Sequence, residues 1–306
     1  MSDKPRSGSR GQQLRRRLFE VGATALTCLA PTRRDEYACP LCAGLYTRAD
    51  LDEKRLNLDH VPPRRFSRSV GIRPIEVLVC EQCNSRAGAK VDPALSQLAE
   101  VREFAEGRSE EHLPVRLHLP DIEHEFRALG QRAGNRFSFT GVERRNPPAM
   151  TRRFEDWFRS AAGAWSFHVS FQSPAARRIG LGVLRATYLT AFAAFGYRYI
   201  LGPAFEPVRL QVKDPDATIV DPLPVFKGTI QGRSDPAITF LHEPFPAVMV
   251  LLDQSFVVFP SDSSDTAFHA RAVRELVGGA PLNFRGVQIP WPRYPTYAFD
   301  REPEGL

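Results

Sequence analysis

The sequence lacks any long apolar run. No window reaches about 18 uncharged apolar residues, which is the length that a membrane-spanning helix needs. A basic stretch at Arg15–Arg17 precedes a modest apolar run from Val21 to Ala30, as in a signal peptide. That run is short for this role, however, and Glu20 stands directly in front of it. The sequence therefore predicts no membrane contact and favours a cytoplasmic protein over an exported one.

Cysteine is also scarce, with 5 in 306 residues. So few cysteines exclude the dense disulfide framework of small secreted domains. Four of the five form two CxxC pairs, Cys39 with Cys42 and Cys80 with Cys83, and such pairs indicate a metal site or a redox motif in a reducing compartment. Two pairs can supply four thiolates to one structural zinc ion. We interpret the fifth, Cys28, as a small buried apolar side chain.

Positive charge is concentrated at one end of the chain. The net charge is +6, and residues 1–100 account for about +5 of it. This asymmetry favours an acidic partner for the N-terminal third, and nucleic acid is the usual one. A solvated basic surface without a partner is the alternative interpretation.

The apolar patterns predict an α+β protein with separate N-terminal and C-terminal parts. Residues 1–12 are small and polar and are expected to be a disordered basic tail. A zinc-containing domain is predicted over residues 13–105 and a C-terminal α+β domain of unknown role over residues 112–306. Between them lies a polar segment, residues 106–111, that has the composition of a hinge.

Within the N-terminal domain, the elements are predicted in the order helix, strand, loop, strand and helix. The first helix covers residues 13–29. Residues 56–60 alternate apolar and polar side chains as a half-buried strand does, and residues 77–79 form a second β-branched run. A helix follows over residues 84–98, with a break near Asp92 because Pro93 cannot continue the preceding helix.

The C-terminal part is predicted to combine one buried helix with several strands. The helix covers residues 175–199 and is apolar almost all round, as expected of a central helix. Arg177, Arg178 and Arg185 in this range argue against a membrane helix. Strands are predicted at residues 137–139, 165–169, 237–241, 247–252 and 256–259. The last three of these should form an antiparallel meander that turns at Asp253-Gln254.

The side chains most suited to catalysis are Asp59 and His60, between the two cysteine pairs, and Asn84 directly after the second pair. Neutral histidine can take a proton from water near neutral pH. Carboxylate and amide oxygens are the ligands that Mg²⁺ and Mn²⁺ prefer. Because Asp59 and His60 are adjacent on a predicted strand, their side chains should start on opposite faces. A metal-dependent hydrolysis of phosphodiesters needs this set of groups.

These residues resemble a known family in their order along the chain. The pattern is Cys39-x2-Cys42, then Leu58-Asp59-His60-Val61-Pro62-Pro63, then Val77-Leu78-Val79-Cys80-x2-Cys83-Asn84-x3-Gly88. It resembles the HNH endonuclease superfamily, in the four-cysteine variety with Asp-His and Asn, which includes phage junction-resolving endonucleases. The resemblance covers about a fifth of the chain, from Tyr37 to Glu100.

The resemblance implies a ββα-metal fold with structural zinc on the four cysteines. It also implies that His60 is the general base and that Asp59 and Asn84 hold one catalytic Mg²⁺ or Mn²⁺ ion. The substrate would be DNA, cut in restriction, anti-phage defence or a mobile element. A homodimer is left open, because endonucleases that cut both strands with one metal per site often work as dimers.

Five arginines near these residues are candidates for contacts with phosphate. Guanidinium groups bind phosphate oxygens in bidentate fashion and need no particular base to do so. The candidates are Arg64, Arg65, Arg68, Arg73 and Arg86.

The chain departs from the commoner HNH pattern at two positions. Ile75 stands where many members have an asparagine, and no second histidine lies near Gly88. The first departure supports an alternative function, a non-catalytic zinc-containing module that binds nucleic acid and retains a vestigial HNH site. A third interpretation is a structural or toxin-like protein that binds another protein through its C-terminal domain.

Overall fold

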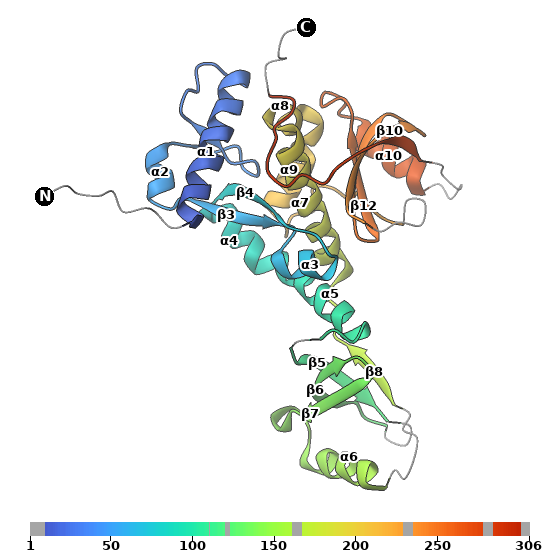
Figure 1. The fold of residues 1–306 in the computed structure, drawn as a ribbon. Helices are drawn as coiled ribbons and strands as arrows, with labels where there is room; N and C mark the ends of the chain where they lie inside the picture. The colour runs from blue at the N-terminus through green and yellow to red at the C-terminus, as the bar shows by residue number, and fades with distance from the viewer. Residues whose placement is uncertain are drawn as a thin grey trace, which may run out of the picture. The chain divides into compact units, whose positions relative to one another are not determined.

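The chain is organised as two compact units. The first contains residues 1–95 and 176–306, and the second contains residues 96–175 (Figure 1). The units therefore do not coincide with the domains predicted from the sequence, since residues 176–306 pack with the N-terminal segment. The computed structural model describes residues 10–109, 111–119, 123–160, 167–228, 235–277 and 284–300.

The first unit begins with helix α1 (Arg10–Leu29). Arg10, Gly11 and Gln12, which were predicted to belong to the disordered tail, form its first turn; residues 1–9 lie outside the described part. The buried face of α1 includes Gly22, where any Cβ would collide with the ring of Tyr37. Cys28 falls outside this face and is exposed, so the prediction that it is buried is wrong.

Two very short strands and a short helix follow α1. Strand β1 (Tyr37–Ala38) pairs with β2 (Leu45–Tyr46), and helix α2 (Arg48–Asp52) comes next. Thr47 caps α2 in a capping box with Asp50, which satisfies the backbone N–H groups at the start of the helix. The tight connection between β1 and β2 carries the first cysteine pair.

A hairpin and a helix form the centre of the N-terminal segment. Strand β3 (Leu56–Val61) pairs antiparallel with β4 (Ile75–Cys80), and α3 (Arg64–Ser69) lies in the connection between them. Helix α4 (Glu81–Lys90) starts directly after β4. The two predicted strands and the order strand, loop, strand, helix are thus present. The helix predicted over residues 84–98 is split into α4 and α5 (Asp92–Ala105).

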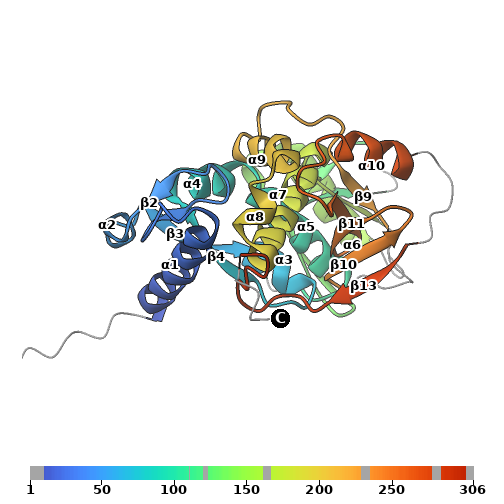
Figure 2. The same cartoon turned by 90° about the horizontal axis from the view of Figure 1, so that it is seen from above.

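Helix α7 (Ala176–Phe195) is the centre of the first unit, as its apolar sequence predicts. Every residue from Leu181 to Phe195 is buried. In both views α7 lies between the β3–β4 hairpin and the C-terminal sheet (Figures 1 and 2). Tyr188 donates a hydrogen bond to the carbonyl oxygen of Pro40 at 2.8 Å, which ties α7 to the loop of the first cysteine pair.

The chain turns sharply after α7, since Gly196 has φ +90, a conformation that favours glycine. Three short helical elements follow: α8 (Tyr197–Ile200), the 3₁₀ turn η2 (Pro203–Phe205) and α9 (Glu206–Lys213). No helix in the described part of the chain is long and apolar enough to cross a membrane.

A five-stranded antiparallel sheet completes the first unit, in the order β13-β10-β11-β12-β9. It contains the predicted meander, with its turn at Asp253 and Gln254. One face of the sheet packs against helix α10 (Phe268–Val277) through a cluster that includes Met249 and Val258. The strands are β9 (Val225–Lys227), β10 (Ala237–Glu243), β11 (Ala247–Leu252), β12 (Ser255–Pro260) and β13 (Arg285–Ile289).

The second unit is a four-stranded antiparallel sheet in the order β7-β6-β5-β8, with a helix packed on it. The rings of Phe126 and Phe154 stack with centroids 3.9 Å apart in its core. The predicted hinge lies inside this unit, where Arg108 bridges to Ala133, and Glu110 of that hinge is outside the described residues. Its elements are β5 (Leu113–His118), β6 (Phe126–Ala133), β7 (Arg136–Gly141), η1 (Glu143–Arg145), α6 (Pro148–Ser160) and β8 (His168–Phe171).

Two strands of this unit were predicted from the sequence. The one predicted at residues 137–139 falls within β7, and the one predicted at residues 165–169 overlaps the start of β8. Trp165 and Ser166 lie outside the described residues. The strands that pair with them, β6 and β5, were not predicted.

Candidate functional site

The four paired cysteines come together as one group. Cys39 follows β1, Cys42 lies in the turn before β2, Cys80 ends β4 and Cys83 is in the first turn of α4. Their Sγ atoms all lie within 4.8 Å of one another. Backbone N–H groups point at the sulfurs: the N–H of Gly44 donates to Cys42, that of Cys80 to Cys39 and that of Cys83 to Cys80, each at 3.4 Å.

The geometry of this cysteine group fits a tetrahedral zinc ion. With a Zn–S bond of about 2.3 Å, neighbouring sulfurs of a regular tetrahedron lie about 3.8 Å apart, and the Sγ atoms of Cys42 and Cys80 are 3.7 Å apart. The pKa values of the thiols diverge within the group: the hydrogen bonds from Cys39 lower the pKa of Cys42 and that of Cys80, whereas burial raises the pKa of Cys39. The group could therefore bind zinc, and four protein ligands leave no open position for catalysis.

His60 faces a carboxylate on the neighbouring strand. It pairs with Glu76 in the register of β3 and β4, and its Nε2 lies 3.4 Å from Oε1 of Glu76. This Nε2 is buried and makes no hydrogen bond to any described residue. Burial lowers the pKa of His60, with a smaller contribution from Arg64 and an opposing one from Glu76. The imidazole is therefore neutral near pH 7 and able to accept a proton.

Asp59 points to the opposite face of the hairpin, as expected for the neighbour of His60 on a strand. Its side chain is 5 % exposed and is ion-paired and hydrogen-bonded with Arg185 of α7, which is 3 % exposed. Arg185 also lies 3.4 Å from Asp92, the first residue of α5. Burial raises the pKa of Asp92 above its ordinary value. One buried arginine thus separates two carboxylates, and we call these three residues the Arg185 cluster.

The Arg185 cluster includes Asp59, one of the two predicted magnesium ligands. Magnesium requires near-octahedral oxygen ligands and usually retains several waters. Asp59 already has a cationic partner and almost no exposure to water, while Asn84 is half-buried in the first turn of α4. As they are placed here, Asp59 and Asn84 do not fit a magnesium or manganese ion, and their assignment as ligands stays a prediction.

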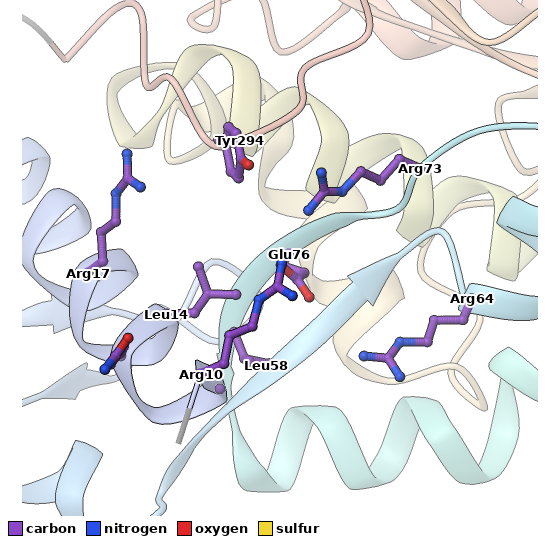
Figure 3. Close-up of a pocket in the computed structure, with 10 residues that line it drawn as sticks. Arg10, Leu14, Arg17, Leu58, Arg64, Arg73, Glu76 and Tyr294 are labelled. Atoms are coloured by element: carbon purple, nitrogen blue, oxygen red, sulfur yellow. The ribbon is translucent and has the colours of Figure 1, made fainter. Parts of the chain in front are cut away.

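The five arginines that were predicted to contact phosphate lie in different surroundings. Arg64 and Arg73 line a cavity next to Glu76 (Figure 3). Arg86 donates a hydrogen bond to the carbonyl oxygen of Lys213 at 3.3 Å and lines a different cavity. Arg65 and Arg68, which are also in α3, do not line the cavity at Glu76.

Sequence reasoning missed several residues of this region, among them Glu76, Arg185 and Tyr294. Glu76 is the one charged residue in the run Ile75–Cys80, and Arg185 is a charge in the middle of an apolar helix. A charge in such surroundings needs a buried partner, because an unpaired charge is costly there. That signal was present in the sequence, but it does not name the partner. Tyr294 carries no comparable signal.

We predict that Arg185→Leu destabilises the first unit by about 3–5 kcal/mol, because removal of one partner leaves buried carboxylates without compensation. Arg178→Leu is the matched control: Arg178 is on the same helix and pairs with Asp216 at 2.8 Å, but both side chains are partly exposed. Such surface pairs contribute about 0–1 kcal/mol. Chemical unfolding of both variants tests this, and equal stabilities would contradict the role of the Arg185 cluster.

No family model matches this chain, and neither does any curated protein or solved structure. The resemblance to HNH endonucleases therefore rests on the residues of the motif alone. The described residues establish a mixed α+β protein with a four-cysteine group near its N-terminus that could bind zinc.

Proposed function

We propose that the protein is an HNH-type endonuclease that hydrolyses DNA phosphodiester bonds. The observation that carries this proposal is the placement of His60. It lies on β3 opposite Glu76, in a strand–strand–helix segment closed at its base by the four-cysteine group, and beside a cavity lined by arginines. A base near a cationic cavity is what hydrolysis of a phosphodiester needs from side chains.

The contact of His60 with Glu76 supports different roles for the two ring nitrogens in this proposal. A carboxylate next to Nε2 favours the tautomer with its proton on that nitrogen, which leaves Nδ1 as the basic atom. His60 then accepts a proton from the attacking water at Nδ1. Glu76, at 3.4 Å from Nε2, stabilises the imidazolium that forms. Glu76 is in this account a positioning residue, as the carboxylate of a catalytic triad is.

Negative charge on the phosphate also has to be stabilised. Arg64 and Arg73 can supply bidentate hydrogen bonds from the cavity beside Glu76. A bound Mg²⁺ or Mn²⁺ ion would supply further charge stabilisation. The need for such an ion stays a prediction of the resemblance, since Asp59 is paired with Arg185.

The second candidate function is a zinc-containing module that binds nucleic acid without cutting it. The Arg185 cluster favours it, because an arginine is paired with the carboxylate that an HNH enzyme would use for its metal. Ile75 at the start of β4 favours it as well. In this case the arginines around His60 bind phosphate and His60 itself has no chemical role.

Binding and cleavage measured on one preparation separate the two candidates. We would use a short duplex labelled at one 5′ end, with Mg²⁺ or Mn²⁺, and follow anisotropy and the products on a denaturing gel. The nuclease proposal expects shortened strands that accumulate with time. Salt-sensitive binding without a magnesium requirement and without product would support the binding module instead.

A further inference from the structure

A cavity of about 550 Å³ lies on the His60 face of the hairpin. Three parts of the chain that are distant in sequence surround it: helix α1, the segment from β3 to β4, and the segment after β13 (Figure 3). Its volume is in the range of ordinary ligand sites. The lining residues are Arg10, Gly11, Gln13, Leu14, Arg17, Leu58, Arg64, Arg73, Glu76 and Tyr294.

The charge of this cavity is strongly positive. Four arginines line it against a single carboxylate, that of Glu76. None of the four forms an ion pair within 4 Å with a carboxylate of the described residues, whereas Arg16, the neighbour of Arg17 on α1, pairs with Asp52 at 3.4 Å. Like charges that share a concave site attract an anion, because its binding relieves their repulsion and the cavity focuses their field.

Tyr294 holds two of these arginines in place. The guanidinium carbon atoms of Arg17 and Arg73 lie 5.8 and 5.7 Å from the centre of its ring. Figure 3 shows the ring between the two side chains. Cation–π contacts at such distances favour these positions of the guanidinium groups. Because Tyr294 is 47 % exposed and lines the cavity, its ring is part of the cavity wall and is not packed in the core.

The cavity adjoins the proposed catalytic base. Glu76 lines it, and the carboxylate of Glu76 lies 3.4 Å from Nε2 of His60. Arg64 lines it as well and is close enough to His60 to lower its pKa. His60 itself does not line the cavity, but its neighbours Glu76 and Arg64 do, whereas Asp59 points to the other face of the hairpin.

We propose that this cavity binds backbone phosphates of a DNA strand and positions the strand beside His60. This inference rests on the proposed function for the identity of the anion. Arg17 and Arg73, held by Tyr294, bind phosphate oxygens on one side, and Arg64 binds them on the side of His60. Helix α1 and the segment around Tyr294 are therefore part of the substrate site, although both lie outside the motif that resembles HNH endonucleases.

The test is DNA binding by single variants of the full-length chain in the His60→Ala background, so that binding is read without cleavage. Anisotropy of a labelled 20-base-pair duplex, measured over a range of salt concentrations, gives Kd and its salt slope. Arg17→Ala and Arg73→Ala are each expected to weaken binding about tenfold and to reduce the slope by about 0.9. Tyr294→Ala should weaken binding, whereas Tyr294→Phe keeps the ring and should bind as the parent does.

Arg16→Ala is the matched control, since it removes the same charge one residue away on the same helix. Unchanged binding by Arg17→Ala and Arg73→Ala, or an equal loss with Arg16→Ala, would overturn the proposed phosphate site. A different result would contradict the nuclease proposal alone. In that case the parent protein would bind DNA through the arginines of the cavity but would not cleave it. Thermal unfolding of each variant shows whether the fold is retained.

Discussion

Cys83→Ser is expected to unfold the N-terminal segment of the first unit. The Sγ atom of Cys83 is one of four within 4.8 Å of one another, and a serine hydroxyl cannot replace a thiolate on zinc at neutral pH. Zinc binding contributes on the order of 10 kcal/mol to the folding of structural sites. Most of that contribution would be lost, which is comparable to the whole stability of a typical domain.

The loss of zinc should destabilise several elements, because the cysteine group joins them. Cys80 ends β4 and Cys83 opens α4, so one ion would join the hairpin to the helix that follows it. Cys39 joins both to the loop after β1, where Tyr188 of α7 also binds. Unfolding of the group would therefore release the contact between α7 and the N-terminal segment.

Zinc content and chemical unfolding measured together check this prediction. The parent chain should contain one zinc ion and Cys83→Ser none. Cys28→Ser serves as the control, because Cys28 is exposed and lies outside the group; its stability should change by no more than about 0.5 kcal/mol. If Cys83→Ser keeps one zinc per chain and unfolds like the parent, the zinc assignment is wrong.

His60→Ala is expected to reduce the rate of DNA cleavage by about 10²–10⁴-fold, which is the usual contribution of a general base. Binding of DNA should survive, since the arginines of the cavity are unchanged. The fold should survive as well, because the His60 side chain is 23 % exposed and makes no hydrogen bond to a described residue through Nε2.

His242→Ala is a suitable control for this variant. His242 lies on β10 and is exposed, and it belongs to neither the cysteine group nor the arginine cavity. Its removal should leave cleavage unchanged. A His60→Ala protein that cuts at more than about a tenth of the parental rate would mean that another group takes the proton.

Local patterns were sufficient to predict much of the N-terminal segment. The alternation in residues 56–60 and the β-branched run at residues 77–79 correctly predicted β3 and β4. Burial does not follow the alternation, however, because Asp59 is buried in β3, and every residue of β4 except Glu76 is buried. Each CxxC pair is a local structure, and the meeting of the two distant pairs could be predicted because one structural zinc ion needs four ligands. The buried helix α7 followed from its apolar sequence.

The ion pairs of Arg185, the cavity and the division into compact units depend on contacts between segments that are far apart in the chain. Local sequence patterns do not encode such contacts. Asp59 and Arg185 are separated by 126 residues, and Tyr294 reaches the cavity from the segment after β13. The return of α7 to the N-terminal hairpin also explains why the compact units differ from the predicted domains. A sequence pattern indicates that Arg185 needs a partner, but only the fold identifies Asp59 and Asp92.

The central claim is most directly tested by nicking of supercoiled plasmid DNA, since one cut per molecule converts it to the open-circle form. The account predicts open-circle product from the parent protein in the presence of magnesium or manganese, and intact plasmid with His60→Ala under the same conditions. Intact plasmid with a parent protein that is folded and contains one zinc per chain would contradict the nuclease proposal and favour the binding module.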